Sequence, residues 1–207
     1  MDDHADQSLD AFLDALADAH IGPAGGAAAA VSGAIGAATV AFACDRTQST
    51  PSSISLSAAR QTCLTQRTTL LALASRDTAA LRARFAETSA SSSADDRIQH
   101  IPVAIAEACE TVLTTAARIA PVSTAPVCVD LLTGGHLTYG ALQSAVQIGQ
   151  MNLESRDTNA KSAGERLIRS QADGEDAYRS LTNTVTTLLG DSTSFEAGEE
   201  ADTVGNN

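Results

Sequence analysis

The stretch that decides the fold is GPAGGAAAAVSGAIGAATVAFAC, residues 22–44. Almost every side chain from Ala27 to Cys44 is small, and no charge interrupts this run. At helical spacing, four of the small residues share one side of the helix: Ser32, Gly33, Gly36 and Ala37. Because such residues let a neighbouring backbone approach closely, the pattern predicts a central, buried helix.

The same stretch is the longest apolar run in the chain, so a membrane span is the alternative interpretation. Its side chains are mainly Ala and Gly, which are weakly hydrophobic compared with Leu or Ile. We therefore expect a helix packed inside a protein and no membrane association. Pro23 and the two glycines Gly25 and Gly26 permit a tight turn from which this helix starts.

Helical periodicity continues on both sides of this element. Ser8 can cap a first helix whose apolar residues fall on one face: Leu9, Phe12, Leu13 and Leu16. Leucines and other aliphatic residues recur at three- and four-residue spacing after it, which predicts further helices over residues 54–85, 97–120, 127–153 and 159–189. Pro102 fits the fourth helix only in its first turn.

These elements predict an all-α fold, an antiparallel multi-helix bundle or array around the Ala/Gly-rich helix. The length of 207 residues suits one domain. We expect a single helical domain over residues 1–189 and an acidic, disordered tail over 190–207, where large apolar residues are scarce.

The composition excludes some classes of function. The formal net charge is -12, the acids are spread along the chain, and Lys161 is the only lysine. Nucleic acid is therefore not an expected partner. The dispersed carboxylates fit a halophilic protein that works in high salt, and an ordinary acidic protein is the alternative.

The four cysteines, Cys44, Cys63, Cys109 and Cys128, lie far apart without a C-x-x-C pair. We expect reduced, mostly buried thiols. No leader pattern is recognisable, which favours a cytoplasmic location. The histidines and cysteines are too scattered to predict a metal site.

The beginning of the chain resembles a known family. SLDAFLDALAD at residues 8–18, then GPAGG at 22–26 and the small-residue helix, is similar to the opening of formimidoyltetrahydrofolate cyclodeaminases and methenyltetrahydrofolate cyclohydrolases. Those enzymes share a helix, a Pro-Gly-Gly-Gly-Ser turn and an Ala/Gly-rich helix. The resemblance covers residues 8–156 and continues more weakly at Arg76-Asp77, Ile101-Pro102-Val103, Asp130 and Met151-Asn152-Leu153.

The resemblance implies chemistry on the one-carbon bridge between two folate nitrogens. Hydrolysis adds water to a methenyl carbon, and cyclodeamination closes the bridge and expels ammonia. The folate carries the reacting carbon, so a tetrahydrofolate derivative is the substrate and no separate cofactor is implied. We expect Asp77 and Asp130 to be the catalytic carboxylates. Alternatively, Asp77 is a solvated carboxylate beside Arg76, and Asp130 is a helix cap.

Four further residues are candidates for substrate binding. The free N–H groups beside Gly25 and Gly26 can receive an anion, Arg46 can reach the glutamate tail, and Asn152 can supply an amide contact. The alternatives are tight helix packing for the glycines and an interaction with the helix dipole for Arg46. The flat Ala/Gly helix also suits a symmetric contact, which predicts a homodimer.

Departures from the family pattern leave the activity open. Ala24-Gly25-Gly26-Ala27 replaces the family's three glycines and serine, and Leu81 replaces a tyrosine. The family's Lys and Tyr after the Ala/Gly helix, and its Gly-Asn before Asp130, have no counterpart. The second hypothesis is therefore a catalytically inactive homologue that acts as a ligand-binding or interaction protein. A third is an unrelated helical protein.

Overall fold

The computed structural model describes residues 7–18, 22–47, 55–86, 92–153 and 158–202. Every regular element in this part of the chain is helical, which confirms the predicted all-α fold. The elements are α1 (Leu9–Ala17), α2 (Gly25–Arg46), α3 (Leu56–Ala86), α4 (Ser92–Ile119), the 3-10 helix η1 (Ala120–Val122), α5 (Ala125–Asn152) and α6 (Thr158–Asp202).

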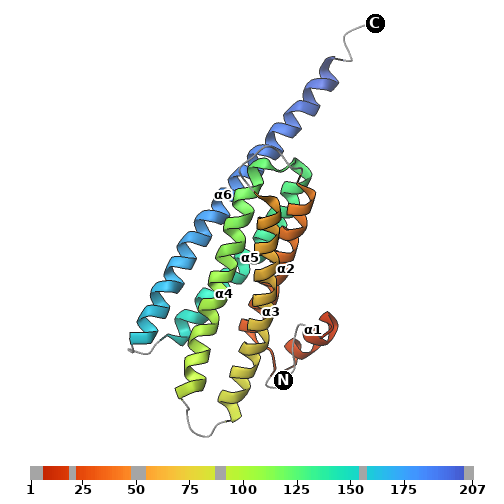
Figure 1. Ribbon diagram of the computed structural model, residues 1–207. Helices are drawn as coiled ribbons and strands as arrows, with labels where there is room; N and C mark the ends of the chain where they lie inside the picture. The colour runs from red at the N-terminus through yellow and green to blue at the C-terminus, as the bar shows by residue number, and fades with distance from the viewer. Residues whose placement is uncertain (1–6, 19–21, 48–54, 87–91, 154–157, 203–207) are drawn as a thin grey trace.

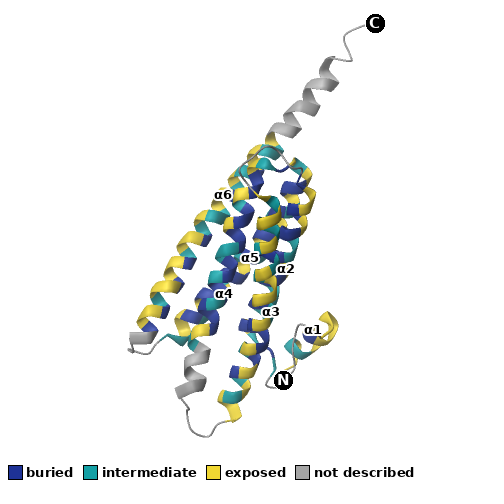
Figure 2. Cartoon of the chain, viewed as in Figure 1, coloured by how far each residue is buried: buried dark blue, intermediate teal, exposed yellow. Residues whose placement is uncertain are grey.

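The five long helices α2–α6 form an elongated bundle, and α1 stands beside it (Figure 1). α2 packs chiefly against α3 and α5, while α4 contacts α3, α5 and α6. Buried residues concentrate on the sides of the helices that face one another (Figure 2). Leucine, isoleucine and valine fill the core, together with many alanines; the largest fully buried side chains include Leu70, Ile105, Leu113, Leu142 and Leu167.

Small residues let α2 and α5 come into backbone contact. A Cβ atom on Gly36 would lie 2.7 Å from the carbonyl oxygen of Gly134, and one on Gly134 would lie 2.9 Å from that of Gly36. Gly33 likewise faces Cys109 on α4 and Leu70 on α3. The predicted central position of α2 is therefore confirmed, and glycine is required where two backbones meet.

α2 is not buried all round. Its side chains Ile35 and Phe42 are 45% and 52% exposed. Among the described residues it is the one helix long and apolar enough to cross a membrane, yet 61% of its most apolar window is buried inside the bundle. The burial agrees with a core helix that leaves one side uncovered.

Helix α1 begins at the predicted N-cap residue, Ser8. The backbone N–H of Ala11 donates to Ser8 Oγ at 3.2 Å. The predicted apolar face is only partly covered, because Phe12 is buried while Leu9 and Leu13 are 58% and 50% exposed. The amphipathic pattern therefore predicted the helix correctly, but only Phe12 of its apolar face is buried against the bundle.

Two details of the later helices differ from the expectation. Pro102 lies in the interior of α4, which begins at Ser92, and not in a first turn. The backbone of α6 continues past residue 190 to Asp202, although the sequence predicts a disordered tail there. The side chains of residues 191–202 lie outside the described part, and the domain boundary at 189 stays a prediction.

An aromatic cluster joins α5 to α6. His136 Nδ1 and the Tyr178 hydroxyl are 2.6 Å apart, and the rings of Tyr139 and Tyr178 stack with their centroids 4.1 Å apart. The two tyrosines of the chain therefore meet in one contact, which gives His136 a structural role.

The four cysteines are free and buried, as predicted. Burial raises the pKa of Cys109 to about 12, so this thiol stays protonated at neutral pH.

The close approach of α2 and α5 gives a stability test. We expect Gly36→Ala to lower the free energy of unfolding by about 1–3 kcal/mol, because the new methyl group overlaps the Gly134 carbonyl. The matched control is Gly140→Ala on exposed α5 surface, where nothing lies within 4 Å; it should be neutral or stabilising by up to about 1 kcal/mol. Urea unfolding measures both. Equal effects of the two variants would contradict the tight contact.

Candidate functional site

A cavity of about 520 Å³ opens where α2 begins, beside the C-terminal halves of α3 and α5. Four of the six predicted site residues line it: Gly25, Gly26, Asp77 and Asn152. They come from three helices that are far apart in the sequence. The remaining lining residues are Ala24, Leu81, Arg84, Phe85 and Ile148.

The glycines at the start of α2 make room for their neighbours. A Cβ atom on Gly26 would lie closer than 3.0 Å to both carboxylate oxygens of Asp77. Gly25 is exposed, and Ile148 on α5 lies 3.6 Å from the position of its missing Cβ. Gly26 is therefore a packing requirement for Asp77, while Gly25 leaves the helix end open to the cavity.

Asp77 points from α3 at the first turn of α2. Its carboxylate accepts a hydrogen bond from the backbone N–H of Ala27. Ala24, the N-cap residue of α2, supplies no side-chain cap, so Asp77 satisfies a donor that would otherwise be open. The alternative of a solvated carboxylate beside Arg76 is wrong, because Asp77 is turned inward and caps another helix.

Burial also changes the acidity of this group. Loss of water around Asp77 raises the pKa of its carboxyl, and the hydrogen bond from Ala27 opposes that rise without cancelling it. A partly buried carboxyl with a raised pKa beside a cavity is a candidate proton-transfer group. Asp77 is therefore a structural cap, and its role in proton transfer stays a prediction.

Sequence reasoning missed the outer half of the cavity wall. Arg84 and Phe85 follow Asp77 on α3 at spacings of seven and eight residues, on the same side of that helix as Leu81, the residue that replaces the family's tyrosine. Phe85 is 64% exposed at the rim. The helical spacing from Asp77 was the signal that could have identified these residues.

The other two predicted site residues lie at the far end of the bundle. Arg46 is the last residue of α2, about 30 Å along that helix from Gly25. Asp130 lies near the start of α5, about 33 Å from Asn152. A single chain therefore does not bring Arg46 and Asp130 to the cavity, and their roles in binding and catalysis stay predictions.

Asp130 is not a helix cap, because α5 begins after Thr124, which occupies the N-cap position. The alternative interpretation of Asp130 as a cap is therefore wrong. Asp130 lies within the second turn of α5 and is half-buried.

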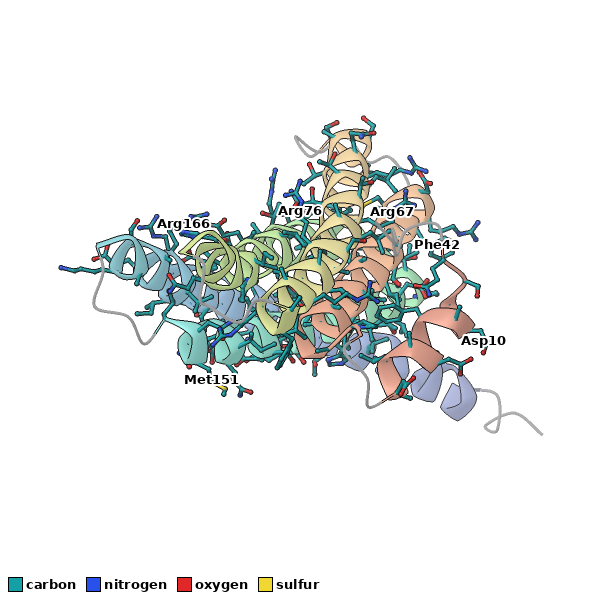
Figure 3. All side chains as sticks on the ribbon, turned by 90° about the horizontal axis from the view of Figure 1, so that it is seen from below. Asp10, Phe42, Arg67, Arg76, Met151 and Arg166 are labelled. Carbon is teal, nitrogen blue, oxygen red and sulfur yellow. The ribbon has the colours of Figure 1, made fainter. Side chains whose placement is uncertain are left out.

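Arginines on the outside of α3 belong to a different surface. Arg67 and Arg76 line a separate hollow between α3 and α4 and project away from the bundle (Figure 3). The immediate neighbour of Asp77 in the sequence therefore does not enter its cavity. Within the described residues, no group of three or more His, Cys, Asp or Glu side chains is placed to hold a metal ion.

Comparison with known proteins places the chain in a family. The sequence profile of the family described as formiminotransferase-cyclodeaminase matches residues 8–167. The chain belongs to the formiminotransferase-cyclodeaminase family. The match starts at the Ser8 cap and ends within α6, so it contains all the residues that line the cavity.

A solved structure agrees with this family assignment. The crystal structure of formiminotetrahydrofolate cyclodeaminase from Thermotoga maritima superimposes with a TM-score of 0.80 at 19% sequence identity. The similarity covers 89% of this chain and 98% of the Thermotoga chain. At this identity the likeness establishes the shared fold. No curated protein matches the chain.

The acidity of Asp77 predicts a pH-dependent stability. Because the folded-state pKa is raised, the stabilising contribution of the protonated carboxyl is complete below its ordinary pKa and is lost as the pH rises through the folded value. Asp77→Asn keeps an acceptor oxygen for Ala27 and removes the titration.

We therefore expect the wild-type chain to lose more unfolding free energy than Asp77→Asn between about pH 4 and pH 7. Asp176→Asn, an exposed carboxylate on α6, is the control with the same change in charge. Urea unfolding at several pH values measures the difference. Parallel pH profiles for wild type and Asp77→Asn would show that burial does not raise the pKa of Asp77.

Proposed function

We propose that this protein is a folate-linked one-carbon enzyme, either a formimidoyltetrahydrofolate cyclodeaminase or a methenyltetrahydrofolate cyclohydrolase. The observation that carries the proposal is Asp77, an inward-facing carboxyl of raised pKa beside the open N-terminal turn of α2. Family membership and the cyclodeaminase fold point to the same substrate class.

Both reactions need proton transfers, which a carboxyl in the cavity wall can supply. In cyclodeamination, folate N10 attacks the formimino carbon and loses its proton, the terminal nitrogen takes up two protons, and the bond from the carbon to that nitrogen breaks to release ammonia. In hydrolysis, water attacks the methenyl carbon and loses a proton; the resulting hydroxyl then loses its proton to form the formyl carbonyl while the departing folate nitrogen gains one and its bond to the carbon breaks. Asp77 can give a proton in the first reaction and accept one in the second.

The remaining wall suits the rest of a folate. Leu81, Ile148 and Phe85 offer apolar surface to the pteridine and benzoyl rings. The Asn152 amide can hydrogen-bond the pteridine edge, and the N–H groups beside Gly25 can donate to an anionic or carbonyl oxygen of the substrate. Arg84 at the rim supplies a positive charge for the glutamate carboxylates.

A catalytically inactive homologue is the second candidate, and one observation favours it. Leu81, which stands in place of the family's tyrosine, lines the cavity and removes a hydroxyl from its wall. In that case the cavity binds a folate-like ligand without turning it over.

Turnover separates the two candidates. The absorbance of 5,10-methenyltetrahydrofolate is followed with purified protein, corrected for spontaneous hydrolysis, and the 5-formimino compound is tested alongside. We expect saturable conversion of one substrate. Asp77→Asn should lower kcat by about 10²–10⁴-fold, because it removes a proton-transfer group. Asp176→Asn, far from the cavity, should keep the wild-type rate.

The outcomes are distinct. Binding of a folate in equilibrium dialysis without conversion of either substrate would favour the inactive homologue. Conversion that Asp77→Asn leaves unchanged would restrict Asp77 to its capping role.

We further propose that the protein works as a cytoplasmic homodimer, with neither nucleic acid nor a membrane as a partner. The uncovered apolar side chains on α1 and α2 support a second copy as the partner. The dispersed net charge of -12 supports adaptation to high salt.

The dependence of the melting temperature on salt concentration tests the proposed adaptation to high salt. We expect the melting temperature to rise between about 0.1 M and 2 M KCl, because chloride salt screens repulsion among the carboxylates. KCl is preferred to a sulfate salt, which strengthens apolar burial by itself. A melting temperature that stays constant or falls would indicate an ordinary acidic protein.

A further inference from the structure

We propose that the hollow between α3 and α4 binds an organic phosphate of nucleotide size, with Arg67 and Arg76 as its main contacts to the ligand. The hollow has a volume of about 790 Å³. It shares no lining residue with the cavity at Asp77, so it is a separate site on the same helix. The binding of this ligand does not depend on the proposed folate chemistry.

Helix α3 is the basic element of an acidic chain. It carries five of the twelve arginines and a single acid, Asp77, so its formal charge is +4 in a chain of -12. Asp77 is turned toward the first turn of α2, and Arg60 pairs with Asp45 at 2.7 Å. The outer side of α3 therefore presents positive charge without an acid of its own helix to neutralise it. Such a local field attracts anions even to a protein whose net charge is negative.

Two of these arginines, Arg67 and Arg76, form no ion pair or hydrogen bond with another residue in the part of the chain that the structure describes. Other exposed arginines do find a carboxylate: Arg60, Arg166 and Arg179. Both unpaired guanidinium groups line the hollow and extend away from the bundle (Figure 3). A guanidinium group donates two parallel hydrogen bonds to a phosphate, so an anion from solution would supply the partner that the chain does not.

The rest of the lining is neutral and mixes polar with apolar groups. Hydroxyl groups come from Thr65, Thr68 and Thr69. Apolar surface comes from Leu64, Leu73 and Ala104. The Thr68 hydroxyl donates to the backbone carbonyl of Leu64 at 3.1 Å, and its oxygen can still accept a hydrogen bond. No carboxylate is among the residues that line the hollow, so nothing in its wall repels a phosphate.

The length of the hollow favours a nucleotide over a small ion. Arg67 and Arg76 are nine residues apart, about 13.5 Å along the axis of α3. Inorganic phosphate or citrate would leave most of this length empty. A nucleoside di- or triphosphate can reach both arginines, because its phosphates bind one guanidinium group while its flat base stacks on the other. The volume also lies within the range of small-molecule sites, about 300–1,000 Å³.

Small side chains keep the hollow open where α3 and α4 meet. Ala72 on α3 is exposed, and Ala104 on α4 is half-buried. Leu73, which is 4% exposed, closes the floor between the two helices. A large side chain at Ala72 would therefore occupy the space that the ligand needs, without disturbing the core.

Equilibrium dialysis with ATP, without divalent metal, tests the binding. It is done at the lowest KCl concentration at which circular dichroism shows the chain folded, because salt screens the attraction between arginine and phosphate. We expect one ATP per chain. Citrate and inorganic phosphate should bind at least tenfold more weakly, because neither spans the two arginines.

Arginine variants test the contacts. Arg67→Gln and Arg76→Gln should each raise the Kd for ATP at least tenfold, because each removes a charged partner of the ligand. Both side chains are exposed, so the melting temperature should change little. Arg179→Gln removes the same charge from α6 and should keep the wild-type Kd.

A variant of unchanged charge separates a shaped site from a general attraction of anions to α3. Ala72→Phe fills the hollow and should also raise the Kd for ATP at least tenfold. Ala172→Phe, at an exposed position on α6, is the matched control and should bind ATP as the wild type does.

Several outcomes would overturn the site. They are a folded wild type that does not bind ATP, an unchanged Kd in both arginine variants, and an unchanged Kd in Ala72→Phe. Citrate or a hexa-aspartate peptide that binds more tightly than ATP would overturn the assignment to a phosphate. Because no readout uses folate turnover, an inactive protein that still binds ATP through Arg67 and Arg76 would count against the proposed function alone.

Discussion

The backbone contact between α2 and α5 is the constraint on which the rest of the structure depends. Gly36 and Gly134 bring each helix against a carbonyl oxygen of the other, and no larger residue fits at either position. This approach fixes how far α2 is drawn into the bundle. It thereby sets which side of α2 remains uncovered and where its first turn opens toward α3 and α5.

The candidate site is a consequence of that placement. With α2 held close, its N-terminal turn has no side-chain cap of its own, and Asp77 reaches across from α3 to supply one. The absence of a Cβ atom on Gly26 makes room for the carboxylate. Asp77 therefore stabilises the first turn of α2 and also lines the cavity, where it is accessible to a ligand.

Several parts of the site could be predicted from the sequence because they depend on local patterns. The turn at Gly25 and Gly26 was visible in the order of small residues, and Asp77 and Asn152 followed from the family resemblance. Arg84 and Phe85 were missed, although they repeat at helical spacing from Asp77, whereas Leu81 had been identified only as the replacement of a family tyrosine. The separation of Arg46 from Gly25 and of Asp130 from Asn152 was implicit in the predicted helix lengths, because each pair lies at opposite ends of one helix. Which of these residues line the cavity depended on how the helices pack.

The sequence by itself determined that this is an all-helical protein built on a small-residue helix, because periodicity and side-chain size act over a few neighbouring residues. Family membership was also readable in the order of its motifs. Only the tertiary structure decided that Asp77 caps α2, that Pro102 is accommodated inside α4 and that Ile35 and Phe42 stay uncovered. Each of these depends on which helices meet at a given point in space, and that depends on packing among residues far apart in the chain.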